Sequence, residues 1–233
     1  ALMLSDARES VLIPTLNQVI KALLDKIKLH ADLPILSHTH GQAATPTTLG
    51  KEFAVYLSRI LRQLEQWQDI KLEAKMNGAV GAYNAHVVAY PEMDWPETSR
   101  TFIEKQLSLA FNPLTTQIEN HDSIIEYSDA LRRLNMVLLD MCRDIWTYVS
   151  MDYLRQEPKA GEVGSSTMPH KVNPIDFENA EGNLGMAQAF AEHFAVKLPV
   201  SRLQRDLSDS TVLRNLGCLL GHSLLSYKSI LKG

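Results

Sequence analysis

The residues best suited to chemistry stand together in one short segment. Residues 164–174 read Gly-Ser-Ser-Thr-Met-Pro-His-Lys-Val-Asn-Pro and combine hydroxyls, an imidazole, an ammonium group and a carboxamide. Glycines at 161 and 164 permit backbone angles that other residues resist, whereas prolines at 169 and 174 fix φ. An ordinary solvated loop would share this glycine, serine and proline content. The density of polar groups, followed at once by a helical pattern, favours a loop that closes over a ligand.

A second polar segment, residues 35–45, contains His38 and His40. Histidine can donate a proton near neutral pH, so His40 is a candidate general acid. A metal site would need a third ligand, so the pair predicts no metal, and surface or capping roles remain open. A general acid also needs a partner that fixes its tautomer. Glu178 is a candidate, although an acidic residue near a helix N-terminus is favourable in itself.

The third polar group is the arginine-rich segment 202–214. The planar fork of arginine binds two oxygens of a phosphate or carboxylate at once. Ser210 and Arg214 are four residues apart and would share one helix face. A solvated charged turn would have the same composition, so the segment alone does not decide between the two.

These groups must be carried by helices, because apolar residues recur at i, i+3 and i+4 through most of the chain. Thr45 and Pro46 are typical of an N-cap and a first helical residue. The sequence shows no run of strand alternation and no tandem repeat. Residues 35–45 are expected to be a loop or extended, and residues 77–96 and 157–173 to be loops. Helices are predicted over 6–30, 46 to near 78, 97–110, 121–154, 174–197 and 209–231.

Long helices with one apolar face predict an all-α fold, an elongated bundle. Tyr56, Trp67 and Met141 have core spacing, so packing is the expected role of these side chains. The helices are long for one short domain, which favours burial against partner subunits. The 157–173 segment is expected to be mobile without ligand.

Composition narrows the function classes. The chain has 233 residues, 45% hydrophobic and 21% charged, with a net charge of −4, so no basic field indicates nucleic acid. No apolar run reaches the roughly 18–20 residues needed to cross a bilayer. Cys142 and Cys218 are expected to be buried free thiols in a reducing, cytoplasmic compartment. The first residues do not form a signal peptide. Both ends look cut, which indicates a piece of a longer protein.

Residues 165–174 resemble the signature of the fumarase/aspartase superfamily, and Thr39-His40-Gly41-Gln42 resembles its second common region. Within the superfamily, residues 168–179 and 205–215 resemble the bacterial adenylosuccinate lyase family. Fumarases and aspartases typically carry Gly where His170 stands, and argininosuccinate lyases typically carry Gln. The resemblance covers nearly the whole chain.

The resemblance implies a lyase of purine biosynthesis. The family splits adenylosuccinate into AMP and fumarate, and also splits succinyl-aminoimidazole-carboxamide ribotide, by β-elimination without a cofactor. Residues 1–233 would be the central helical domain, with the small N-terminal and C-terminal domains absent. Family members are homotetramers with shared active sites, so the chain alone is expected to have little or no activity.

The resemblance also implies a role for each matching residue. Ser165 would be the base that removes the Cβ proton, His40 would protonate the leaving nitrogen, and Glu178 would orient His40. A serine base needs nearby positive charge and exclusion of water. Lys171 and Asn173 would hold the succinyl carboxylate, on which negative charge develops. Other substrate contacts would come from Thr39, Gln117, Ser166, Asn179, Arg205, Ser210 and Arg214, the last three chiefly at the phosphate.

Two alternatives remain. The first is another lyase of the superfamily, such as argininosuccinate lyase or fumarase, against which Arg205, Ser210 and Arg214 argue because they suit a phosphate. The second is a helical bundle without chemistry, which is disfavoured because Ser165, His40 and Lys171 are all intact.

Overall fold

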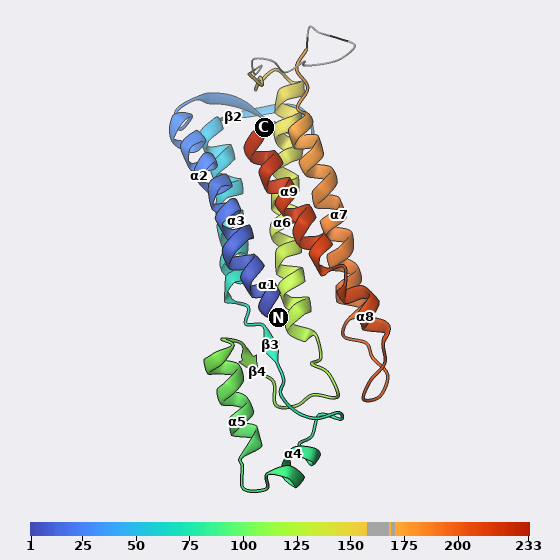
Figure 1. Cartoon of the computed structure of the whole chain (residues 1–233). Coiled ribbons are helices and arrows are strands. Elements are labelled where there is room, and N and C mark those ends of the chain that lie inside the picture. Colours follow the sequence, from blue (N-terminus) through green and yellow to red (C-terminus); the bar gives the residue numbers. More distant parts are fainter. Residues whose placement is uncertain (158–167, 169–170) are drawn as a thin grey trace.

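Apolar residues at helical spacing produce an elongated bundle of long helices that run side by side (Figure 1). The computed structural model describes residues 1–157, 168 and 171–233. The bundle is formed by α2 (Ile13–Leu29), α3 (Leu49–Asp69), α6 (Asp122–Ser150), α7 (Ile175–Lys197) and α9 (Leu216–Lys232). The predicted all-α bundle is therefore confirmed.

The core consists of the apolar stripes that these helices turn towards one another. α7 packs against α6 and α9, and α3 packs against α2 and α6. Trp67 is fully buried, and its ring centroid lies 5.2 Å from that of Tyr127 on α6. Tyr56 and Met141 are buried as well. The predicted packing role of Tyr56, Trp67 and Met141 is confirmed.

A small polar network also crosses the core between α6 and α9. The Asn135 side chain donates to Ser223 Oγ at 2.9 Å and accepts a hydrogen bond from the Tyr227 hydroxyl at 2.8 Å. All three residues are fully buried, and the Ser223 hydroxyl in turn donates to the Leu219 backbone oxygen at 2.8 Å. Buried polar groups with complete hydrogen bonding fix the relative register of the helices that carry them.

The segment before α3 is a β-hairpin rather than a helix start. β1 (Pro34–Thr39) pairs antiparallel with β2 (Gln42–Thr48). Thr45 and Pro46 lie in β2, so the predicted N-cap at Thr45 is wrong, and α3 begins three residues later than Pro46. Thr48 is the N-cap, because its side chain accepts the Lys51 backbone N–H. Pro46 is tolerated because β2 is an edge strand of a two-stranded sheet.

The turn of the hairpin is formed by His40 and Gly41. Both have positive φ, 54° and 72° respectively. Two consecutive residues in this region form the tight turn that matches the twist of antiparallel strands. The predicted loop or extended segment at 35–45 is thus extended, with a two-residue turn.

A small lobe lies at the lower end of the bundle in Figure 1. α3 ends at Asp69 rather than near residue 78, because the next residue, Ile70, is extended. The predicted loop 77–96 contains a short helix, and the predicted helix 97–110 ends four residues early. The lobe contains β3 (Glu73–Ala74), α4 (Asn84–Ala89), α5 (Trp95–Thr101), the π-helix η2 (Phe102–Gln106) and β4 (Ala110–Phe111).

The remaining predicted helices are confirmed with changed ends. α1 (Leu2–Ala7) and the π-helix η1 (Arg8–Leu12) lead into α2 without a break. The predicted helix 209–231 is divided at Asn215, between α8 (Ser208–Leu213) and α9. Among the described helices, none has the combination of length and apolar character that a membrane span requires.

The lobe contains a glycine that no other residue could replace. Gly81 has φ +81°, and a Cβ atom there would lie 1.9 Å from the backbone oxygen of Thr115. Gly41 has a similar φ, +72°, but a Cβ atom would meet nothing within 4 Å. The two positions therefore separate backbone strain from steric overlap.

We predict that Gly81→Ala lowers the urea midpoint of unfolding far more than Gly41→Ala does. Gly41→Ala should cost only the strain of a left-handed alanine, about 1–2 kcal/mol. Gly81→Ala must in addition displace the Thr115 backbone. Equal midpoints for the two variants would contradict the packing of the lobe.

The two cysteines differ in their surroundings. Cys142 on α6 is buried, whereas Cys218 on α9 is exposed, so the expectation of two buried thiols is wrong for Cys218. Cys218 lies near the start of α9. Burial raises the pKa of the Cys142 thiol to about 12, with a further contribution from the negative charge of Glu181.

We predict that Cys142 does not react with a thiol reagent at pH 8 in the folded chain, since the thiolate is the reactive form. The Cys218→Ser variant isolates this thiol, and unfolding in urea should release it for reaction. The Cys142→Ser variant is the matched control for the exposed thiol. Rapid labelling of Cys142 in the folded chain would contradict its burial.

Candidate functional site

The predicted site residues divide between the two ends of the bundle (Figure 1). The hairpin, the start of α7 and the end of α6 lie at one end, and α8 lies beside the end of α7 at the other. Nineteen residues of one helix separate Glu178 from Lys197, about 28 Å at 1.5 Å per residue. One copy of the chain therefore does not bring all the predicted residues together. Ser165, Ser166 and His170 lie outside the described residues.

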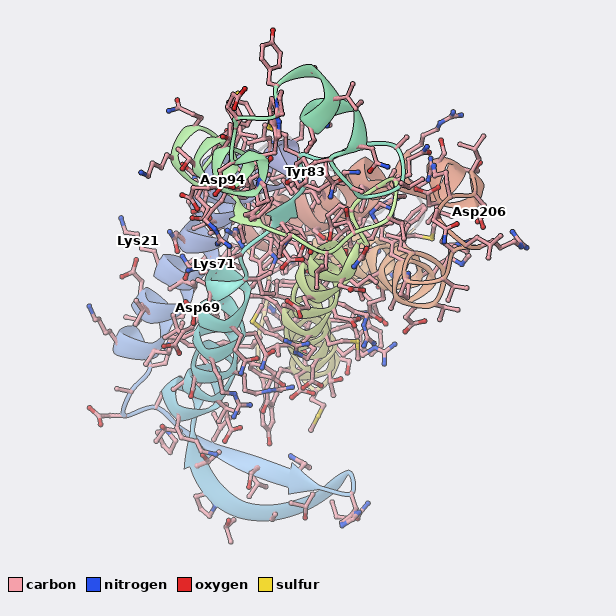
Figure 2. The ribbon with its side chains drawn as sticks, turned by 90° about the horizontal axis from the view of Figure 1, so that it is seen from below. Lys21, Asp69, Lys71, Tyr83, Asp94 and Asp206 are labelled. Carbon is pink, nitrogen blue, oxygen red and sulfur yellow. The ribbon has the colours of Figure 1, made fainter. Side chains whose placement is uncertain are left out.

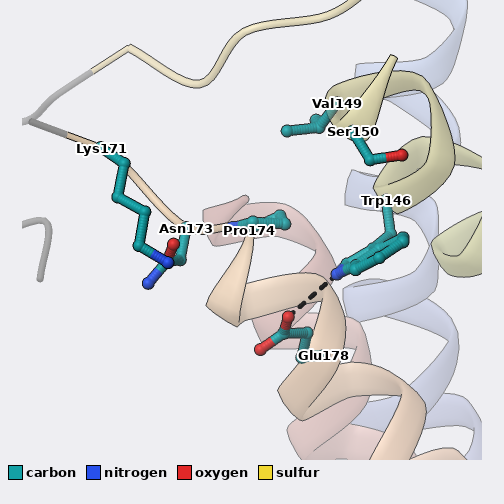
Figure 3. Close-up of a pocket in the computed structure, with 7 residues that line it drawn as sticks. All are labelled: Trp146, Val149, Ser150, Lys171, Asn173, Pro174 and Glu178. Atoms are coloured by element: carbon teal, nitrogen blue, oxygen red, sulfur yellow. Dashed lines mark hydrogen bonds between the residues drawn. The ribbon is translucent and has the colours of Figure 1, made fainter. Parts of the chain in front are cut away.

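The end with the hairpin holds a pocket of about 280 Å³. The end of α6 and the start of α7 form its walls, and Figure 3 shows the Lys171 and Asn173 side chains next to each other. Lys171 is exposed, so its ammonium group is accessible to an anion in the pocket. The lining residues are Trp146, Val149, Ser150, Lys171, Asn173, Pro174 and Glu178.

The partner of Glu178 is a residue that the sequence analysis did not identify. Trp146 Nε1 donates a hydrogen bond to Glu178 Oε1 at 2.9 Å (Figure 3). Among the described residues, His40 makes no hydrogen bond with Glu178. The predicted pairing of Glu178 with His40 therefore does not form within one chain, and it stays a prediction for an assembly.

His40 itself lies at the exposed tip of the hairpin, and Thr39 beside it is exposed as well. The hairpin is fixed to the end of α6 through Tyr153, whose hydroxyl donates to the backbone oxygen of Leu36 at 3.2 Å. The ring of His38 also contacts Tyr153 edge-on, with 5.9 Å between centroids. His40 is therefore exposed at the tip, while the strand before it is fixed to the end of α6.

Asn179 points towards α9, not into the pocket. Its side chain donates to Ser229 Oγ at 2.9 Å, and its Oδ1 accepts from Asn183 at 3.1 Å. Asn179 follows Glu178 by one residue, which on a helix turns its side chain by about 100°. The predicted substrate contact from Asn179 stays a prediction, because these hydrogen bonds must open for it.

At the opposite end, the structure brings Gln117 next to the arginine segment. The Gln117 backbone N–H donates to the Gln204 oxygen at 3.1 Å, directly before Arg205. Lys75 holds the same segment through its ammonium group, which donates to the oxygens of Gly78, Thr116 and Gln117 at 3.3, 3.2 and 2.5 Å. Burial lowers the pKa of Lys75.

The Arg205 guanidinium is hydrogen-bonded to a buried carboxylate, that of Asp209. Arg205 Nη1 donates to Asp209 Oδ1 at 2.9 Å, and His121 Nε2 lies 3.1 Å from Asp209 Oδ2. Burial alone would raise the pKa of Asp209, but the hydrogen bonds from His121 and Arg205 outweigh it, so the pKa is lowered. Asp209 is therefore an ionised carboxylate in the interior.

The rest of the arginine segment is more open. Arg214 is exposed and Ser210 is half-buried, both at α8. Asp206 accepts hydrogen bonds from the Ser208 hydroxyl and backbone, which together lower its pKa to about 2. Figure 2 shows Asp206 at the edge of the molecule, apart from Tyr83 and Asp94 of the lobe.

The two ends suit different chemistry. The pocket end presents an ammonium and a carboxamide, which stabilise negative charge on a carboxylate. The other end presents guanidinium and hydroxyl groups, which suit a phosphate. Among the described residues, no group of three or more His, Cys, Asp and Glu side chains could hold a metal ion.

Sequence reasoning missed Trp146, Lys75, His121 and Asp209. Trp146 falls inside a predicted helix next to core positions, so only its polar nitrogen could have marked it. His121 stands at the start of a predicted helix without being a usual capping residue, which was an available signal. Lys75 has only backbone partners, and such contacts leave no sequence pattern.

Comparison with known proteins gives two family matches, which follow each other along the chain. A family model described as "Lyase" matches residues 1–190, and one described as "Adenylosuccinate lyase C-terminal" matches residues 201–233. The adenylosuccinate lyases of Escherichia coli (strain K12) and Legionella pneumophila (strain Corby) are 53% and 54% identical over the whole chain. That of Dictyostelium discoideum is 51% identical over 235 aligned residues.

The chain spans about half the length of these relatives, 51%, 51% and 50% respectively. Among solved structures, the 3-carboxy-cis,cis-muconate lactonizing enzyme from Pseudomonas putida matches 100% of the chain and 52% of its own, with a TM-score of 0.79 and 24% identity. This likeness concerns the fold. The matches to the family model and to relatives above 50% identity concern the sequence itself, and by them the chain belongs to the lyase family of the fumarase/aspartase superfamily.

Proposed function

We propose that this chain supplies the central part of an adenylosuccinate lyase, which eliminates fumarate from adenylosuccinate to give AMP. The same site would act on succinyl-aminoimidazole-carboxamide ribotide, in purine biosynthesis in the cytoplasm. The observation that carries the proposal is the identity of more than 50% to adenylosuccinate lyases over all 233 residues. Residues 1–233 would be the central helical domain of the longer enzyme.

The proposed reaction assigns distinct tasks to the two ends. Ser165 would take the proton next to the succinyl carboxylate, with Ser166 beside it. Lys171 and Asn173 would stabilise the charge that this step builds on the carboxylate. His40 would protonate the leaving nitrogen, since a neutral amine leaves far more readily than its anion. No cofactor is required for such an elimination.

The substrate spans both ends in this proposal, and therefore more than one chain. The carboxylate residues and the phosphate residues of a single chain are about 28 Å apart along α7, farther than one nucleotide reaches. In a homotetramer with shared sites, the hairpin end of one chain can lie next to the arginine end of another chain, so the two sets of residues can bind one substrate.

The surface of α7 supports such an assembly. Its exposed side includes Met186 and Val196, which are 49% and 74% exposed. Gly182 and Gly185 lie on the same side, with open space where a Cβ atom would be. Small and apolar residues on an uncovered helix face allow another helix to approach closely.

We predict that Ser165→Ala lowers the kcat for adenylosuccinate cleavage by about 10²–10⁴-fold, the usual contribution of a positioned base. The assay uses the complete lyase that contains these residues and follows fumarate release. Ser10→Ala, an exposed serine on η1, is the matched control and should keep normal activity. Argininosuccinate serves as the competing substrate.

A normal rate in Ser165→Ala would contradict the assignment of the base. Cleavage of argininosuccinate in preference to adenylosuccinate would contradict the proposed substrate, and no turnover of either would contradict the enzyme function.

We also predict that two inactive variants restore each other's activity. His40→Ala and Arg205→Met alter opposite ends of the chain, so a mixed tetramer contains some sites without either substitution. Unfolding and refolding the two variants together should yield activity that neither shows alone. A mixture no more active than the sum of its separately refolded variants would show that each site belongs to one chain.

A further inference from the structure

We propose that His121 and Asp209 are positioning residues that fix the Arg205 guanidinium in the orientation needed to bind the phosphate of the substrate. The inference rests on the proposed function, and it concerns residues that touch Arg205 rather than the substrate.

Asp209, the partner of Arg205, is buried. Only 8% of its side chain is exposed, and each carboxylate oxygen has its own donor, Arg205 for Oδ1 and His121 for Oδ2. An arginine paired with a surface acid rotates freely with its partner, and such pairs stabilise little. Here the acid is buried and held on both sides, so the guanidinium has a fixed point of attachment.

His121 has a left-handed backbone conformation. It occupies the N-cap of α6 with φ +68°, a left-handed conformation that few non-glycine residues adopt, and Asn, Asp and His adopt it most often. Its side chain makes no capping hydrogen bond. The imidazole instead reaches Asp209. Because an ionised carboxylate only accepts hydrogen bonds, His121 Nε2 must carry the proton.

His121 is also connected to the rest of the site through its backbone. Its backbone N–H donates to Glu119 Oε2 at 2.8 Å, two residues after Gln117. Gln117 in turn is bound to the residue before Arg205 through its backbone N–H. The Arg205 segment is therefore attached through Gln204 and Asp209 to one stretch of the chain, residues 117–121.

Arg205 keeps part of its guanidinium accessible to a ligand. A guanidinium has five N–H donors, and Asp209 takes one of them at Nη1. About a quarter of the side chain is exposed, so the remaining donors can reach a ligand. A guanidinium that is already oriented loses less entropy when it binds an oxyanion.

The test compares the two products as inhibitors of the complete lyase. AMP carries a phosphate and fumarate does not. Loss of Arg205 positioning should therefore weaken the binding of AMP and leave the binding of fumarate unchanged. His121→Asn removes the reach to Asp209 and keeps a residue that tolerates positive φ. We predict that it raises the inhibition constant of AMP about tenfold and leaves that of fumarate and kcat unchanged, a loss of about 1.4 kcal/mol.

Two controls separate this role from a structural one. Tyr227→Phe removes a buried hydrogen bond of the core, to Asn135, and should leave both inhibition constants unchanged. In the Arg205→Met background, which lacks turnover, AMP binding is measured directly by calorimetry. His121→Asn should not weaken it further, because a positioning residue acts only through its partner.

Equal weakening of AMP and fumarate, or an additive effect in the Arg205→Met background, would overturn the inference. Failure of the unaltered lyase to cleave adenylosuccinate would refute the proposed function instead. The same cycle of variants is then measured by binding of inorganic phosphate, and an unchanged affinity in His121→Asn would overturn the inference there as well.

Discussion

The burial of α6 between α3 and α7 is the interaction on which the rest of the structure depends. Leu131, Leu134, Leu138 and Met141 are fully buried along one side of this helix. Each such side chain contributes about 1.5–3 kcal/mol relative to an exposed one. Because α6 spans 29 residues, about 43 Å, it also fixes how far apart the two ends of the bundle lie. The separation of the site residues follows from this one rigid element.

The sequence predicted what depends on helical periodicity and missed what depends on partners. The helices over 121–154 and 174–197 follow from apolar spacing, which packing against neighbours then enforces. The hairpin was not predicted because Ser37, His38 and Thr39 show no apolar alternation. Burial of one strand face is what produces that pattern. Pro46 was misread for the same reason, since an edge strand and a helix start both tolerate proline.

The site shows the same limit in sharper form. Residue types indicated Lys171, Arg205 and Glu178, and the structure places these three side chains at the pocket or at the arginine segment. Their partners were not predictable, because Trp146 lies 32 residues from Glu178 along the chain, and only folding brings the two together. A sequence motif identifies the residue types that the chemistry needs. The residues that position them are set by tertiary packing, which a single sequence indicates only weakly.

The two lysines near the site illustrate why charge alone does not identify a ligand-binding residue. Lys75 and Lys171 carry the same ammonium group, but three backbone oxygens occupy that of Lys75. An ammonium has three donors, so Lys75 has none left for a substrate and serves to join two loops. Lys171 extends beside an open pocket. Arg205 lies between these cases, because its five donors allow one bond to Asp209 and others to an oxyanion. An arginine anchored by one bond can therefore be both held by the protein and available to a phosphate, whereas Lys75, with all three donors occupied, cannot.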